Sequence, residues 1–323
     1  MATGRGFPGI LAIKAESTWG TVVAADTKLP FISEDLTETF AHLPNESLLG
    51  AGIRQRAYQG ARAVQGGFVA YWTYALAQPL LKAFFGNHTV AASADDYYDM
   101  QETVDGVSLS VAIAKQVSVH EYAGFKVNQL TLSGSPTDAV RIAAAGFAKS
   151  RSLTSSTNTA GTLAALSDPA NIIQYHHLVL RVGDLADALA GGDAISPASF
   201  ELTLTRNLEP ALVNSQTPLE ALENNFREGM LTLEIPRYTA DTFLNWHSSH
   251  TTLQADLIFT SGSLVKTIRL PQLLVVSAPA NIGGPGLVPV TVTLSLQSNR
   301  DAANAQSGFT FTDEIRILEA DGS

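Results

Sequence analysis

The sequence predicts a mainly β protein built from two copies of one β domain, each copy carrying a single flanking helix. Three observations lead to this prediction. Alternating apolar and polar residues, the pattern of half-buried strands, recur along the whole chain. Convincing helical segments are few. Finally, a segment that begins at Gly67 matches another that begins at Gly229, and the same order of expected elements surrounds both.

Strand patterns are clear in both halves of the chain. Leu109, Val111 and Ile113 alternate with small residues, and two further strands are expected over 124–133 and 139–148. The second half repeats this behaviour over four more segments, which are 199–205, 252–260, 264–277 and 287–297. Such alternation is typical of sheets with one face in a core and the other face toward water.

Helical signals are limited to two good segments and one short turn. Residues 75–85 have apolar residues at helical spacing and are followed by Gly86, which commonly ends a helix. Residues 239–246 form the second candidate. A single turn is expected over 184–189, before Gly191 and Gly192.

The internal repeat defines the expected domains. An ungapped offset of 162 residues, from Gly67 to Gly229, aligns Val69 with Leu231, Leu81 with Phe243 and Phe84 with Trp246. Each copy then reads as strand, long irregular stretch, strand, helix and three strands. The irregular stretches, 41–60 and 210–225, are longer than hairpin loops need to be. Chance similarity between β-rich segments is the alternative.

We therefore predict a first β domain over residues 1–150 and a second over 176–323. The intervening residues 151–175 are rich in Ser, Thr, Ala and Asn, a composition typical of an interdomain linker. The linker is long for a hairpin connection, so it is expected to run across a surface.

Composition restricts the class of protein. Of the 323 residues, 45% are apolar and only 15% are charged, which suits an ordered chain with much of its surface against other subunits. The net charge of −10 argues against a protein that grips nucleic-acid phosphates. Because the chain has no cysteine, disulfides and thiolate metal sites are excluded.

Targeting signals are not evident either. No apolar run approaches the ~18 residues of a membrane helix, so no membrane insertion is expected. The N-terminal stretch has one arginine, and its short apolar patch is interrupted by Pro8 and Lys14, unlike a secretory signal. We expect synthesis in a cytoplasm and no export by the usual route.

Motif-like features favour ordinary structural roles. GRGFPG (4–9) has the glycine spacing of a dinucleotide loop, but it follows no strand and contains proline. HSSH (247–250) and His176-His177 lack the third and fourth ligands that zinc needs. DDYYD (95–99) could bind a cation, but an acidic loop is the simpler interpretation. We expect no cofactor and no metal ion.

No catalytic motif of a serine hydrolase, P-loop enzyme or zinc protease is present. A dispersed Ser-His-Asp site stays open, but nothing in the sequence indicates one. We therefore do not expect an enzyme.

Five segments together resemble the tail tube, or major tail, proteins of long-tailed bacteriophages. They are IKAESTWGT (13–21), LPFISEDL (29–36), the glycine-flanked strand and helix of 60–86, GFKVNQLTLSGS (124–135) and SFELTLTRNLEP (199–210). The resemblance is scattered over roughly residues 10–300, and its specificity lies in the ordered set rather than in one motif.

The resemblance implies a fold and an assembly. Tail tube domains are small β-sandwiches or barrels with one flanking helix, and they form six-fold or pseudo-six-fold rings that stack into a hollow tube. Strands of neighbouring domains join into one inner barrel, which removes exposed edges. A duplicated chain would need three copies to close such a ring. The alternative is a ring of six chains in which only one half lines the lumen.

The resemblance also implies partners and a location. The chain would bind copies of itself and other tail proteins, namely the terminator, the distal tail or baseplate proteins and the tape measure. Viral DNA would pass through the lumen into the host without specific binding, and an acidic wall would let the duplex slide. The protein would be made in the bacterial host cytoplasm and would end in the tail of the virion.

Ring stacking is expected to use the two long stretches, because the corresponding loop makes ring–ring contacts in the family. The candidate apolar anchors are Leu48, Leu49, Ile53, Leu219 and Leu222. Loops packed on their own domain would look the same in sequence, so that alternative stays open.

Two other functions remain as alternatives. One is a tail-completion or baseplate component on a related β fold, which closes a ring without stacking further. The other is a carbohydrate-binding or hydrolytic β-sandwich. The latter would need clustered exposed aromatic residues or paired carboxylates, and the chain has only three tryptophans, Trp19, Trp72 and Trp246.

Overall fold

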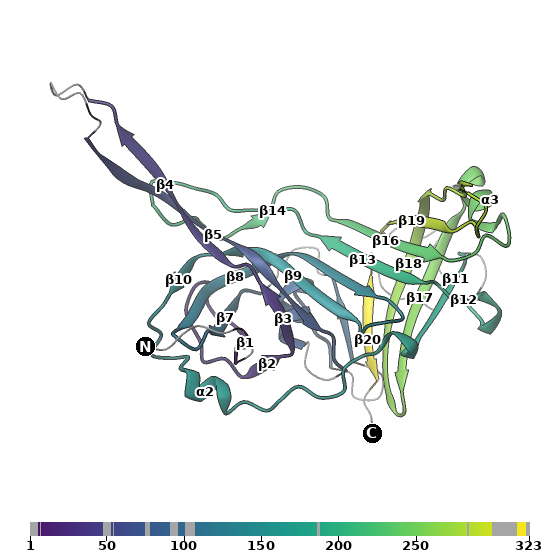
Figure 1. Ribbon diagram of the computed structural model, residues 1–323, viewed down its shortest axis with the longest axis horizontal. Coiled ribbons are helices and arrows are strands. Elements are labelled where there is room, and N and C mark those ends of the chain that lie inside the picture. Colours follow the sequence, from purple (N-terminus) through teal and green to yellow (C-terminus); the bar gives the residue numbers. More distant parts are fainter. Residues whose placement is uncertain are drawn as a thin grey trace.

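The chain folds into a mainly β structure, as predicted, and Figure 1 shows the arrangement of its strands. The computed structural model describes residues 6, 8–47, 53, 55–74, 78–90, 96–100, 107–185, 188–282, 284–298 and 315–320.

The strands of the first half are β1 (Ile10–Ala15), β2 (Thr27–Leu29), β3 (Phe31–Glu34), β4 (Thr37–Asn45), β5 (Gln55–Tyr71), β6 (Asp96–Asp99), β7 (Leu109–Ala114), β8 (Val119–Gly134), β9 (Arg141–Ala148) and β10 (Ser150–Ser152). Those of the second half are β11 (Leu178–Asp184), β12 (Ala194–Ile195), β13 (Ser199–Thr205), β14 (Leu208–Glu209), β15 (Leu222–Glu223), β16 (Glu228–Ile235), β17 (Thr252–Ser261), β18 (Leu264–Ser277), β19 (Val290–Leu296) and β20 (Arg316–Ala320).

The α-helices within the described residues are α1 (Gln78–Phe85), α2 (Ala160–Ala164) and α3 (Thr242–Ser249). Two single turns of 3₁₀ helix lie at Tyr175–His177 and Gly191–Asp193. Both predicted main helices are present, although α3 begins three residues later than the sequence pattern indicated. The described residues of 184–189 contain no helix, because β11 extends to Asp184.

The two halves share one order of antiparallel strand pairing. In the first half, β3 and β4 pair with β5, followed by β9, β8, β7 and β1 in turn. In the second half, β13 pairs with β16, followed by β19, β18, β17 and β11. A helix follows β5 in one case and β16 in the other, at the same point in the order.

Matching β-bulges accompany this shared order. Along β8, the ladder to β7 shifts after Tyr122, and the ladder to β9 shifts after Val127. Along β18, the ladder to β17 shifts after Leu270, and the ladder to β19 shifts after Val275. Both pairs of bulges are therefore separated by the same length of strand. Bulges are specific features of a fold rather than defects, so their agreement is informative.

The ungapped offset of 162 residues is wrong because it aligns residues from opposite faces of the two strands. Val69 lies on the half-exposed face of the sheet, where it is paired with Ala143. Leu231 is fully buried in the core, whereas the buried residues beside Val69 are Phe68 and Ala70. A shift of one residue exchanges the two faces of a strand. The sequence could not reveal this shift because apolar residues stand on both faces of β5.

The stretch 41–60 is also not the irregular loop that was expected. β4 and β5 extend through most of it as a long hairpin that projects from the body of the protein (Figure 1). The exposure pattern of β4 explains why the strand was missed. Seven of its nine residues are exposed, so no buried face imposes an alternating sequence pattern.

The predicted linker, 151–175, is structured and packs on the first half. Leu163 of α2 is fully buried against Ala12 and Ala112. Asn158 accepts a hydrogen bond from the Ala25 amide (2.8 Å) and donates one to the Glu121 carboxylate (2.7 Å). Further along, the Ile173 amide donates to the Trp72 carbonyl (2.8 Å). These contacts hold the segment on the first half, and we call residues 151–175 the strap.

One hydrophobic core extends across both halves. Leu132 of β8 lies opposite Leu202 of β13, and the rings of Trp72 and Phe259 meet edge to face with centroids 5.4 Å apart. The C-terminal strand β20 adds a second connection, since it lies between β18 and β6.

Candidate assembly and channel surfaces

A single continuous sheet passes through both halves. The second part of β8 has β9 on one edge and β13 on the other, so the strand order becomes β3/β4, β5, β9, β8, β13, β16, β19 and β18. The order contains the same four-strand unit twice, joined at the β8–β13 pair. We call the sheet face away from the core the polar face.

Small hydroxyl-bearing and amide side chains dominate the middle of the polar face. Thr131 and Thr203 lie directly opposite each other, with their hydroxyl oxygens 3.3 Å apart. The neighbouring positions of the same face are occupied by Gln129, Ser133, Thr232, Thr291, Thr293 and Ser295. The opposite, core-facing positions carry leucine, phenylalanine and valine, such as Leu132, Leu202 and Leu231. This alternation is what a sheet with one wet face requires.

Carboxylates give the polar face an acidic balance. Glu201, Glu228 and Glu234 all lie on this face of β13 and β16. The arginine of the same face, Arg141, forms an ion pair with Asp138. Such a surface offers little to bind the phosphates of a nucleic acid, which are held mainly by Lys and Arg.

Two shallow hollows lie on the polar face. One, of about 510 Å³, is lined by Ser133, Arg141, Glu201 and Thr232 among others. The other, of about 340 Å³, is lined by Val69, Gln129, Thr131 and Ala143 among others. Each hollow is therefore formed by side chains of several neighbouring strands.

Exposed apolar residues gather at one end of the molecule. The projecting β4–β5 hairpin, here called the arm, carries the cross-strand pair Leu43 and Tyr58, which are 53% and 62% exposed. The stretch between β13 and β16 adds further exposed apolar residues, namely Leu212, Val213 and Phe226. Large exposed apolar side chains in such number indicate a contact surface.

The stretch 210–225 lies beside the arm because it docks on the first half of the chain. The Arg62 amide donates to the Gln216 carbonyl (2.8 Å), and the Gln216 side chain donates to the Gln59 carbonyl (3.0 Å). The buried Lys126 ammonium pairs with Glu220 at 2.6 Å. The apolar side chains of the stretch, Leu212, Val213, Leu219 and Leu222, stay about half exposed despite these contacts.

The residues that the sequence singled out for stacking fall into two groups. Ile53, Leu219 and Leu222 are 81%, 49% and 51% exposed, so each is accessible to another subunit. Leu48 and Leu49 lie outside the described residues. Sequence reasoning missed Leu43, Tyr58 and Phe226, although they stand in or beside the same two stretches.

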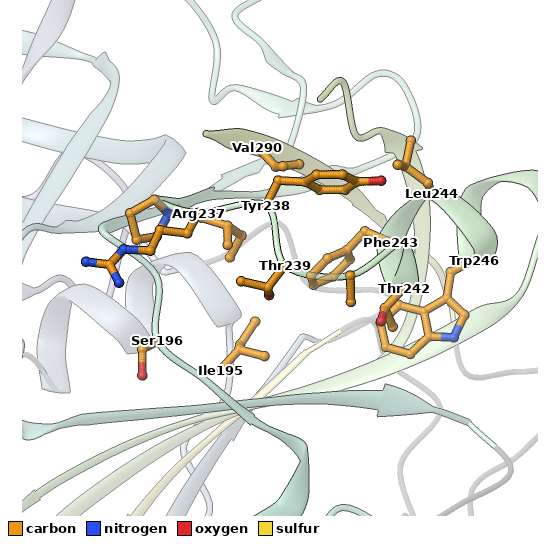
Figure 2. A pocket seen from close by; sticks show the side chains of 13 residues that line it. Ile195, Ser196, Arg237, Tyr238, Thr239, Thr242, Phe243, Leu244, Trp246 and Val290 are labelled. Atoms are coloured by element: carbon orange, nitrogen blue, oxygen red, sulfur yellow. The ribbon is translucent and has the colours of Figure 1, made fainter. Parts of the chain in front are cut away.

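An apolar pocket lies at the other end of the strands, beneath α3 (Figure 2). Its volume is about 380 Å³, and its lining includes Ile195, Ile235, Pro236, Tyr238, Phe243 and Trp246. Figure 2 shows the aromatic rings of Tyr238, Phe243 and Trp246 around this space. In contrast to α1, whose Leu80, Leu81 and Phe84 are fully buried, α3 has no buried residue.

Several of the motif-like residues make ordinary structural contacts. In the part of the chain that the structure describes, no three His, Asp or Glu side chains are arranged to hold a metal ion. Asp99 instead pairs with Arg316 at 2.5 Å, and His177 lies 3.0 Å from the Tyr74 hydroxyl. Of GRGFPG, residues 4, 5 and 7 lie outside the described part. None of the described helices is long and apolar enough to cross a membrane.

The comparison with protein families gives a match over nearly the whole chain. A model of the phage tail tube protein family matches residues 7–297. The chain belongs to the phage tail tube protein family. The resemblance seen in the scattered sequence segments is thereby confirmed. The comparison with curated proteins found no match.

Membership gives this tail tube protein a structural role in a phage tail, where it assembles with itself and with other tail proteins. The described surfaces suit such a role. The arm, the polar face and the pocket beneath α3 are made by different residues and are separate surfaces. A self-assembling subunit needs several distinct contact surfaces of this kind.

Proposed function

We propose that this tail tube protein is a duplicated subunit, of which three copies close a ring of six β domains. Rings stack into a hollow tube, and phage DNA passes through it into the host. The domains are residues 1–150 and 176–323, and 151–175 is the strap between them. The observation that carries the proposal is the shared strand order of the two halves, including their matching bulges.

The junction between β8 and β13 supplies the geometry for ring closure. Within one chain, this junction joins the first four-strand unit to the second. To continue the sheet in the same way beyond the second unit, the first unit of another copy must pair with it. Strand β3 and the start of β4 pair with β5 alone among the described pairings, which leaves their other edge open. Open edges are ready sites for strand addition.

At the opposite margin, the pairing of β18 with β17 ends at Leu274, and beyond it β18 pairs with β19 alone among the described pairings. Val276 is 49% exposed at the end of this strand, and Ile282 beyond it is 82% exposed. Ile32 of β3 is 41% exposed on the other margin. Pairing these two margins between copies would cover all three side chains. Three such junctions would close the sheet into a barrel without edges.

The polar face would then line the channel. Hydroxyl and amide side chains keep it wet, and the carboxylates of Glu201, Glu228 and Glu234 repel phosphates. A DNA duplex could slide along such a wall because no cation array holds it.

Stacking would use the arm and the neighbouring stretch 210–225. Ile53, Leu219 and Leu222, together with Leu48 and Leu49, are the proposed anchors. The exposure of Ile53, Leu219 and Leu222 in the single chain is consistent with burial against the next ring.

Electron microscopy of the purified full-length protein tests the proposal. Negative-stain images should show hollow tubes, and native mass spectrometry of tubes dissociated at low salt should give complexes of three chains. Complexes of six chains would replace the trimer by the hexamer alternative. Protein that stays monomeric at every concentration, or that forms only isolated closed rings, would contradict the tube role. A Thr232→Ala variant serves as the control, since this change on the polar face should leave assembly intact.

A further inference from the structure

The place equivalent to the pocket beneath α3 is filled in the first half. There, the strap enters between the ends of β5 and β9. The Ile173 amide donates to the Trp72 carbonyl (2.8 Å), and the Val140 amide donates to the Ile173 carbonyl (2.8 Å). Ile173 itself is fully buried. Thr73 and Ala139 also bridge to the same segment.

In the second half, the corresponding strand ends bond directly to each other, since the Tyr238 amide donates to the Val288 carbonyl (2.8 Å). The ladder between β16 and β19 ends at the pair Ile235 and Val290. Both residues line the pocket, and so do the residues that follow β16 as far as Ala240. Among the described residues, no third segment is hydrogen-bonded between these strand ends as the strap is in the first half.

The strap segment has a definite position in the strand order. It immediately precedes β11, which pairs with β17. The strand that holds the same place in the first half is β1, which pairs with β7. What precedes β1 is the N-terminal segment, residues 1–8. Within one chain, the strap that leads into the second half fills the space at the strand ends of the first half. Between two copies, the N-terminal segment of the next copy holds the equivalent position in the strand order.

We propose that residues 1–8 of one copy occupy the pocket beneath α3 of a second copy. This inference rests on the ring of the proposed function, and it adds a second contact to the strand junction. We take the segment from a second copy because β1, which it precedes, lies in the body of the first half, whereas α3 lies at the far edge of the second half (Figure 1). In the first half, the equivalent contact is made by the strap, which leads into the second half.

The chemistry of the segment suits the pocket. Residues 1–8 contain Met1 and Phe7 and no acidic residue. The pocket is lined mainly by apolar and aromatic side chains, and its volume is about 380 Å³. At about 30 Å³ per molecule, the empty space would hold on the order of ten waters against apolar walls. An aromatic side chain such as Phe7 would displace them and bury ~200 Å² of surface.

Disulfide trapping between copies tests the proposal, and the absence of cysteine makes the chain suitable for it. Two single variants are prepared, Phe7→Cys in the N-terminal segment and Leu244→Cys in the lining of the pocket. After mixing, assembly and mild oxidation, the expected product on a non-reducing gel is a covalent pair containing one chain of each variant. Each variant oxidised alone should give at least tenfold less. A mixture of Phe7→Cys with Thr232→Cys, on the polar face, is the matched control and should also give at least tenfold less.

The outcomes separate this inference from the proposed function. If hollow tubes form but the mixed pair is no more abundant than in the control, the N-terminal inference is wrong and the tube role stands. If no assembly of any kind forms, the tube role itself fails. A Phe7→Ser variant adds a readout without cysteine. Its critical concentration for assembly should rise about tenfold or more, and an unchanged value would count against the pocket contact.

Discussion

Thr131 of β8 and Thr203 of β13 face each other across the junction of the two halves, with hydroxyl oxygens 3.3 Å apart. One residue further along each strand, Leu132 and Leu202 meet on the opposite face, in the core. The same strand pair therefore joins the two halves by apolar contact on one side and presents a wet surface on the other. The two faces differ because successive side chains of a strand point to opposite sides of the sheet.

Truncation on the two sides of this junction should have very different effects. Leu202→Ala removes a fully buried side chain and should lower the free energy of unfolding by about 2–5 kcal/mol, because a cavity is left behind. Thr203→Ala, its neighbour on the polar face, should cost less than about 1 kcal/mol. Urea unfolding monitored by circular dichroism measures both values. Equal effects would mean that the core does not lie on the Leu202 side.

Charge reversal on the polar face should make assembled tubes bind DNA. Glu201→Lys combined with Glu228→Lys places cations on the proposed channel wall, where they can hold phosphates. Duplex retention by tubes is measured by co-sedimentation at increasing salt and should fall steeply as salt rises. Asp26→Lys combined with Asp168→Lys, at exposed positions outside this face, makes the same charge change as a control. Equal binding by the two variants would show that the polar face is not the channel wall.

The sequence was sufficient for the strands that have one buried face. β13, β17 and β19 alternate regularly, so their positions and inward residues could be predicted. The order of elements in the two halves could also be read, but not its exact alignment. Val69 and Phe68 are both apolar, and only burial distinguishes the residue that faces the core.

Other features were beyond the sequence for physical reasons. The arm has no buried face in the single chain, so β4 shows no alternation. The docking of 210–225 depends on Arg62 and Gln59, which are far away in sequence. The pocket beneath α3 brings together Ile195, Tyr238 and Val290, which are far apart in sequence. Sequence patterns report local preference and burial, and these three features are long-range.

Tyr122 should make the protein lose stability at alkaline pH. Its hydroxyl donates to the Leu36 carbonyl (2.9 Å), and burial raises the pKa of Tyr122 to about 12. The folded-state pKa lies above the unfolded value of about 10, so this stabilisation is complete below pH 10 and is lost as the pH rises through 12. The loss is on the order of 3 kcal/mol.

The variant Tyr122→Phe checks this pH dependence. Its unfolding free energy should be lower at pH 7 by about 1 kcal/mol, because the Leu36 carbonyl loses its donor. Between pH 10 and pH 12 the variant should lose less stability than the original protein. Tyr58→Phe on the exposed arm is the control and should follow the original protein throughout. A Tyr122→Phe profile parallel to the original one would exclude Tyr122 as the source.

The ion pair between Lys266 and Glu319 should be sensitive to removal of one partner. Their charged atoms lie 2.5 Å apart, and both residues are buried where β18 meets β20. Burial lowers the pKa of Lys266, and Glu319 opposes this shift. Glu319→Leu should destabilise the fold by about 3–5 kcal/mol, because it leaves a buried cation without its partner. The double variant Lys266→Met with Glu319→Leu should recover most of that loss in chemical denaturation. Equal destabilisation of the single and double variants would contradict this account.

Removal of the outer arm should separate ring formation from stacking. Residues 44–56 are deleted, and Leu43 is joined to Ala57 through Asn-Gly, which favours a tight hairpin turn. The inner part of the arm retains its pairing, so the chain should fold and unfold as before in urea. Ring closure uses the margins of the continuous sheet, which the deletion does not touch. We therefore expect soluble rings and no tubes in negative-stain images, since the proposed stacking anchors Leu48, Leu49 and Ile53 are gone. The double variant Leu219→Ser with Leu222→Ser, on the neighbouring stretch, should weaken stacking in the same direction without shortening the arm. Tubes of normal length from the deletion would remove the arm from the stacking contact.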